Sequence, residues 1–248
     1  MKKIIFISIV FALFFTACKK EDTPTDATLH GTRLKAYTVK HNSSIFKYTI
    51  SYNSFNKMDK VVMEEDGLVY RTAYLIYKND KSLDSIISKN SDGSLYSAMN
   101  IECNNFNIVQ YNTQYTNTTV TYNRNGFVDK RIYIDESFFR NEYGGDSVLL
   151  YYKDNPVSPE VLKIKYKLSA TIKNPFYITG FEKEAYITGV IFYYNNSMNA
   201  LLPTIEIQAT EYYPLKVKNY IIEGNFNGYP TSRIRDYEIS ETFTYEEF

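Results

Sequence analysis

The sequence predicts an all-β protein, arranged as an extended, curved antiparallel sheet of repeated hairpins. The chain has 248 residues, among them 25 Tyr and 16 Phe but no Trp, and tyrosine suits half-buried strands. Apolar and polar residues alternate in several runs, and a hairpin-like pattern recurs along the chain. A β-sandwich and a half-barrel are alternative arrangements of the same hairpins.

Alternation with a period of two gives the strands one apolar and one wet face. In residues 162–168, Leu, Ile, Tyr and Leu alternate with three lysines, and residues 48–52 alternate in the same way. A sheet that exposes lysines on one face is typical of antiparallel pairing. Shorter strands are expected at residues 148–152, 201–209 and 217–222.

A strand–turn–strand pattern repeats three times, each copy having a Tyr seven residues before an Asp. The copies are "ISYNSFNKMDKV" (50–61), "LIYKNDKSLDSI" (75–86) and "VTYNRNGFVDKR" (120–131). Residues 101–110 and 222–234 form degenerate copies. Cys103 takes the Tyr position in the first, and Asn227-Gly228 supplies the turn of the second.

The repeated acids Asp59, Asp84 and Asp129 have two interpretations. They could form a carboxylate ladder for calcium, or each could close a turn by accepting hydrogen bonds from nearby amides. The closely spaced acids of calcium loops are absent from the sequence. We therefore expect turn-closing residues and no metal site.

The first seventeen residues have the pattern of a signal peptide, with basic Lys2 and Lys3 before a short apolar run. "FTAC", residues 15–18, resembles the lipobox of bacterial lipoproteins, and the resemblance implies that Cys18 is lipidated. Residues 18–33 are then a flexible tether, and residues 34–248 form the β-rich domain. We expect this lipid to attach the protein to a membrane.

The residues that follow Cys18 resemble the surface-export signal of Bacteroidota-type lipoproteins, a Lys followed by two acids. Here the candidate signal is Lys20, Glu21 and Asp22. The resemblance implies an outer-membrane lipoprotein that faces the cell exterior.

Most of residues 34–248 resembles surface lipoproteins of gut Bacteroidota that carry a domain of unknown function, distantly similar to tyrosine–aspartate repeats. Besides the hairpins, the resemblance includes "NPFY" (174–177), "LLPT" (201–204) and "NGYPTSRI" (227–234). It implies an extended, curved antiparallel sheet and no known activity.

Two stretches are less regular. Residues 136–160 contain "NEYGGDS" and "KDNPVSP", which are typical of loops, so a seam within the domain is predicted there. Residues 182–196 begin with helix-forming residues and continue with β-branched and aromatic ones, so both helix and strand are open, and we favour a strand.

No motif nominates a catalytic, metal or cofactor site. The two histidines, His30 and His41, fit no zinc spacing, and the sequence has no phosphate-binding glycine loop. The 28 basic and 28 acidic residues balance, which argues against nucleic acid as a partner. We expect a protein without cofactors that is not an enzyme.

Two modification sites and two functions remain as expectations. Asp-Ser-aliphatic triplets at Ser85 and Ser147 resemble bacterial O-glycosylation sites. We predict a lipid-anchored cell-surface module that binds or scaffolds a glycan, a peptide or an outer-membrane partner. The alternative is a cell-surface hydrolase that uses an unidentified pair of carboxylates.

Overall fold

The computed structural model describes residues 31–104, 108–113, 117–123, 128–175, 201–208, 216–224, 227–235 and 239–248. These residues contain sixteen β-strands, and within them no helix is long and apolar enough to cross a membrane. The strands are β1 Thr32–His41, β2 Ser44–Tyr52, β3 Met58–Glu65, β4 Leu68–Tyr77, β5 Leu83–Asn90, β6 Leu95–Asn104, β7 Ile108–Thr113, β8 Asn117–Tyr122, β9 Val128–Tyr133, β10 Phe138–Gly144, β11 Ser147–Lys153, β12 Val161–Lys173, β13 Leu201–Gln208, β14 Lys216–Glu223, β15 Ser232–Arg235 and β16 Ile239–Glu247.

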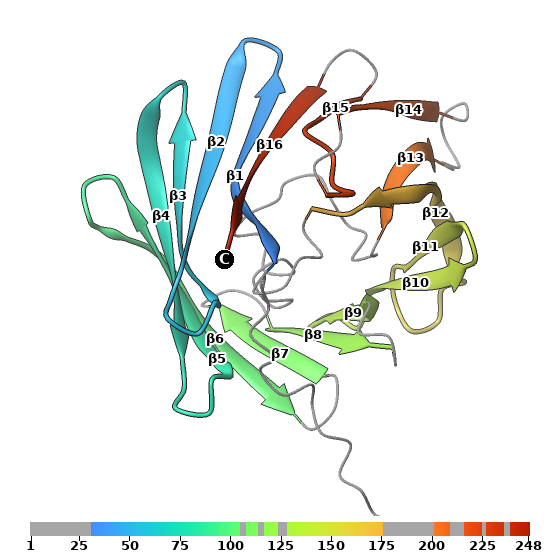
Figure 1. The fold of residues 1–248 in the computed structure, drawn as a ribbon. Helices are drawn as coiled ribbons and strands as arrows, with labels where there is room; N and C mark the ends of the chain where they lie inside the picture. The colour runs from blue at the N-terminus through green and yellow to red at the C-terminus, as the bar shows by residue number, and fades with distance from the viewer. Residues whose placement is uncertain are drawn as a thin grey trace, which may run out of the picture. The chain divides into compact units, whose positions relative to one another are not determined.

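The strands form one antiparallel sheet in which each pairs with its neighbours in the sequence. β1 pairs with β2 on one side and with β16 on the other, so the strand order closes into a barrel (Figure 1). The prediction of an all-β, curved antiparallel sheet is confirmed. The curvature exceeds the predicted open sheet, because the first strand meets the last.

All five predicted hairpins are present. The three clear copies are β2–β3, β4–β5 and β8–β9, and the two degenerate copies are β6–β7 and β14–β15. Asn227 and Gly228 both have positive φ angles, 51° and 87°, as the predicted turn requires. The other Asn-Gly pair, Asn125-Gly126, lies outside the described residues.

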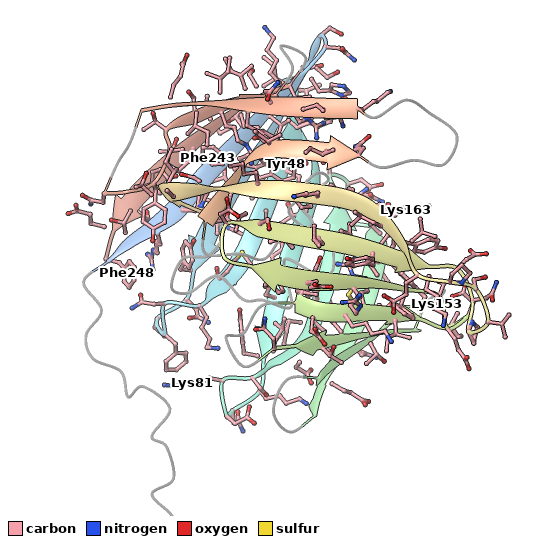
Figure 2. The ribbon with its side chains drawn as sticks, turned by 90° about the vertical axis from the view of Figure 1, so that its right-hand side faces the viewer. Tyr48, Lys81, Lys153, Lys163, Phe243 and Phe248 are labelled. Atoms are coloured by element: carbon pink, nitrogen blue, oxygen red, sulfur yellow. The ribbon has the colours of Figure 1, made fainter. Side chains whose placement is uncertain are left out.

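A hydrophobic core lines the inner face of the barrel over the first strands. Val61, Ile86 and Val120 are at most 1% exposed, and they lie in one cluster with side chains from β1 and β16. Tyr37 stacks on Tyr48 of β2 and on Phe243 of β16, with ring centroids 5.8 and 5.3 Å apart (Figure 2 labels the two partners). Aromatic packing thus continues across the junction between the first and last strands.

The repeated Asp residues do not close turns. Asp59, Asp84 and Asp129 each have no partner in the register and are the extra residue of a β-bulge, because the Tyr of each copy pairs with the residue just before the Asp. The prediction of turn-closing residues was wrong. A polar residue fits there because a bulged residue leaves the regular ladder and its alternation of faces.

Tyrosine hydroxyl groups bind the backbone next to two of these bulges and next to a third one, in β1. The hydroxyl of Tyr52 donates to the carbonyl of Leu34, and that of Tyr77 donates to the carbonyl of Met58, both at 2.6 Å. Tyr143 donates in the same way to Val128, again at 2.6 Å. Each acceptor precedes a bulged residue, where the ladder is disrupted and a carbonyl needs another partner.

Other acids close the turns. Asp80, Asp92 and Asp135 each accept hydrogen bonds from the amide and hydroxyl of the Ser two residues later, at 2.6 to 3.0 Å. The bonds from the Ser hydroxyl and amide lower the pKa of all three carboxyl groups. The three turns therefore carry ionised acids at neutral pH.

The predicted irregular stretches have different outcomes. Residues 136–160 contain all of β10 and β11, which pair with each other and with β9 and β12. The pairing therefore continues through the stretch where a seam was predicted. Residues 182–196 lie outside the described residues.

We expect Tyr77→Phe to lower the free energy of unfolding by about 1–2 kcal/mol, because the Met58 carbonyl loses its hydroxyl donor. Tyr74→Phe is the matched control, since this neighbouring tyrosine is 40% exposed. Urea denaturation measures both variants. Equal midpoints for the two would show that the tyrosine hydroxyl at the bulge does not stabilise the fold.

Candidate functional site

Charged and polar side chains gather on the inner face of β1 and β13–β16. Elsewhere the inner face of the barrel is mainly apolar. Three of them are almost fully buried, Arg233, Glu206 and Glu241, with 2%, 4% and 3% exposure. We call the whole group the polar cluster. It consists of Tyr37 (β1), Glu206 and Gln208 (β13), Lys218 and Tyr220 (β14), Arg233 and Arg235 (β15) and Glu241 (β16).

One half of the polar cluster joins β15, β16 and β1. Arg233 and Glu241 lie directly opposite each other in the register, and their side chains form a buried ion pair. The other carboxylate oxygen of Glu241 accepts a 2.5 Å hydrogen bond from the hydroxyl of Tyr37. The Arg233 guanidinium also lies over the ring of Tyr220, 4.8 Å from its centroid.

Burial and the charge of Glu241 raise the pKa of Tyr37, so its hydroxyl stays protonated and donates. Burial would lower the pKa of Arg233, but the nearby Glu241 carboxylate outweighs this effect and raises it. Arg233 therefore remains a cation. This half of the polar cluster thus consists of one cation, Arg233, one anion, Glu241, and one neutral donor, Tyr37.

The other half is centred on Glu206. Tyr220 donates to one carboxylate oxygen at 2.6 Å, and Gln208 donates to the other at 2.7 Å. The Lys218 ammonium lies 3.4 Å from this carboxylate, and the Arg235 guanidinium lies 4.0 Å from it. Four side chains from three strands thus surround a single buried acid.

Burial alone would raise the pKa of Glu206, but the hydrogen bond from Tyr220 and the charge of Lys218 oppose it, and the net shift is downward. Among the described residues, each carboxyl group with a displaced pKa is displaced downward. A glycosidase needs an acid with a raised pKa to protonate the leaving group. Glu206 is therefore an ionised acceptor surrounded by donors, an arrangement that is suited to binding polar groups.

The outer face of the same strands is aliphatic. Val217 and Ile221 of β14 are 49% and 44% exposed, and Ile207 lies directly opposite Val217 in the register. Ile234 of β15 lies directly opposite Ile221. In β13–β15 the alternation is therefore inverted, with polar side chains inside and aliphatic ones outside.

The predicted site residues do not meet in the polar cluster. Cys18, Lys20, Glu21 and Asp22 lie outside the described residues. Ser85 is half-buried in β5 opposite Ile76 and Asn100, and Ser147 is half-buried at the start of β11 opposite Gly144. No group of three or more potential metal ligands occurs in the part of the chain that the structure describes.

Sequence reasoning did not find the polar cluster. The local signal is present, since Glu206 and Gln208 alternate with isoleucines, and Arg233 and Arg235 flank Ile234. Alternation alone predicts that the isoleucines face inward, which is the reverse of the arrangement observed. Only the pairing of five strands shows that the charges face one another.

No protein-family model and no curated protein matches the sequence. Among solved structures, a porin-like protein from Bacteroides uniformis matches with a TM-score of 0.55 and 13% identity, over 86% of this chain and 96% of that one. A porin-like protein from Bacteroides vulgatus matches with a TM-score of 0.37 and 6% identity, over 87% and 99% of the two chains. The first match shows a shared fold.

We expect Glu241→Gln to destabilise the protein by about 3–5 kcal/mol, because Arg233 would lose the anion that balances its buried charge. The control is Glu142→Gln, which alters the exposed pair that Glu142 forms with Arg140 at 3.4 Å and is expected to change stability by at most about 1 kcal/mol. Denaturant unfolding compares the variants. Similar losses for both would contradict the central role of the buried pair.

The polar cluster also predicts an acid-dependent loss of stability. The folded-state pKa of Glu206 lies below the ordinary value of 4.5, so ionised Glu206 stabilises the fold at higher pH. This contribution is lost as the pH falls below that value. Glu206→Gln should flatten the dependence of unfolding free energy on pH in this acidic range, and an unchanged slope would refute the assignment.

Proposed function

We propose that the protein is a lipid-anchored binding or scaffold module on the outside of the outer membrane, which recognises a glycan, a peptide or an outer-membrane protein. Cys18 carries the lipid, and Lys20, Glu21 and Asp22 direct export to the cell surface. Several acyl chains on one cysteine make attachment effectively permanent, since each buried CH₂ contributes about 0.8 kcal/mol.

The observation that carries this proposal is which face of the sheet holds the apolar side chains, among the described side chains of β1–β12. Apolar side chains face inward, while Lys47, Lys60 and Lys165 project outward from the middle of their strands. A barrel that spans a membrane needs the opposite arrangement, and each lipid-facing Lys at the bilayer centre costs about 2–4 kcal/mol. This wall suits water, which supports attachment through a covalent lipid and not through the strands themselves.

The binding role has support from the polar cluster. Lys218 and Arg235 are its more exposed cations, with side chains 23% and 15% exposed beside the buried Glu206. Together with Tyr220 they present donors and an ionised acceptor, which are the groups that orient polar ligands. The alternative of a hydrolase would need a second, protonated carboxyl group beside the ionised Glu206.

We expect Cys18→Ser to move the protein from the membrane fraction to the soluble fraction, because the thiol that carries the lipid is gone. Replacing Lys20, Glu21 and Asp22 with Ala should keep the protein membrane-bound but protect it from protease added to intact cells. Fractionation and surface proteolysis measure the two effects. Continued membrane attachment of Cys18→Ser, or unchanged surface proteolysis, would refute the corresponding part of the proposal.

A further inference from the structure

The barrel has two chemically different ends. β1 begins and β16 ends at one of them, which we call the near end, and the β2–β3 and β4–β5 turns also lie there. The far end carries the described turns at residues 42–43, 66–67, 91–94, 134–137 and 154–160. Figure 2 shows Lys81 of a near-end turn and, toward the opposite end, Lys153 and Lys163, which flank a far-end turn.

Exposed apolar side chains gather at the far end. Of twelve large apolar residues that are strongly exposed in the described part of the chain, seven lie in or within two residues of far-end turns, whereas only Phe55 and Ile76 lie so at the near end and three lie on the outer wall. The seven are Ile45, Leu68, Val69, Leu95, Tyr96, Ile134 and Val157, with exposures from 42% to 94%. Clustered exposed apolar residues mark candidate interaction sites, so this asymmetry makes the far end the candidate docking surface.

Contacts between neighbouring hairpins join the first of these tips. The amide of Ile45 donates to the Asp66 carboxylate at 2.8 Å, which connects the β1–β2 and β3–β4 turns. The Arg71 guanidinium of β4 lies 3.3 Å from the centroid of the Tyr96 ring of β6. Three consecutive hairpins therefore present Ile45, Leu68 and Tyr96 on one surface.

The charge of the far-end turns is one-sided. The five described turns contain six acids and neither Lys nor Arg, the acids being Asp66, Asp92, Asp135, Glu136, Asp154 and Glu160. Glu160 is balanced by Arg140 at 2.8 Å. Within two residues of these turns lie three lysines and two further acids, so acids outnumber lysines there by eight to three. The lysines are Lys40, Lys89 and Lys153, and the further acids are Glu64 and Glu65. The outermost layer thus combines aliphatic tips with carboxylates.

We propose that the far end is a docking surface for a cationic amphipathic segment of a partner protein. Apolar residues of the segment cover tips such as Leu68 and Ile134, and its Lys or Arg residues face the turn carboxylates. An anionic membrane surface would be repelled by these acids, and a second copy of the same end would place like charges together. This deepens the binding role proposed above by assigning a surface and a partner chemistry.

The test uses the full chain carrying Cys18→Ser, so that no covalent lipid contributes, and a synthetic amphipathic helix of Leu and Lys of about 18 residues. We expect saturable binding that weakens as salt is raised, since exposed charges are screened. Two matched peptides separate the contributions: one with Glu in place of Lys, and one with Ser in place of Leu. Both should bind at least about tenfold more weakly.

Variants locate the surface. Leu68→Ser and Ile134→Ser should each weaken binding of the Leu/Lys peptide about five- to tenfold through lost apolar contact, and Glu136→Gln should reduce its salt dependence. Phe55→Ser is the control, because Phe55 is 59% exposed at the near end, and its binding should equal that of the unsubstituted protein. Circular dichroism confirms that each variant keeps its β-structure.

Several outcomes would overturn the proposal. Equal binding of the Leu/Glu peptide, or unchanged binding by both Leu68→Ser and Ile134→Ser, would exclude this surface. Flotation of the protein with phosphatidylcholine vesicles that is lost in Leu68→Ser would assign the tips to a membrane instead. Self-association in sedimentation that is lost in the same variant would assign them to a second copy. None of these results bears on attachment through Cys18.

Discussion

The ion pair between Arg233 and Glu241 lies where the last strands approach the first, and the closed sheet depends on it. Burying two charges is costly unless each is fully compensated. Here Glu241 is also bonded to Tyr37 of β1, so the compensation itself spans the junction. Aromatic stacking of Tyr37 on Phe243 adds apolar contact at the same place. The junction between the first and last strands therefore combines a buried ion pair with aromatic packing.

Elsewhere in the sheet, hydrogen bonds from tyrosine hydroxyl groups to the backbone beside bulges recur. Bulges bend their strands and disrupt the ladder, and at three of them, beside Leu34, Met58 and Val128, a tyrosine from another strand supplies a hydroxyl to the neighbouring carbonyl. Bulges increase the local twist and bending of strands, and repeating them favours a sheet that curves onto itself. The abundance of tyrosine thus follows from two demands, packing on the inner face and donation at the bulges.

The sequence was sufficient to predict the hairpins but not the site. Periodicity and turn residues depend on neighbours a few positions apart, so β2–β3, β4–β5 and β8–β9 could be identified from their own residues. The bulged Asp84 was misassigned because bulge and turn both favour a polar residue. The polar cluster depends on side chains from residue 37 to residue 241, whose proximity is a property of closure.

Pairing of the first and last strands has a consequence for how the protein is made. Thr32 pairs with Glu247, so β1 lacks one neighbour until nearly the whole chain has been synthesised. During that interval its free backbone edge is an opportunity for wrong pairing with other chains, as in any unfinished sheet. A chain of this design would benefit from a chaperone that shields its leading edge. The contribution of β16 is therefore as much protection during biogenesis as stability afterwards.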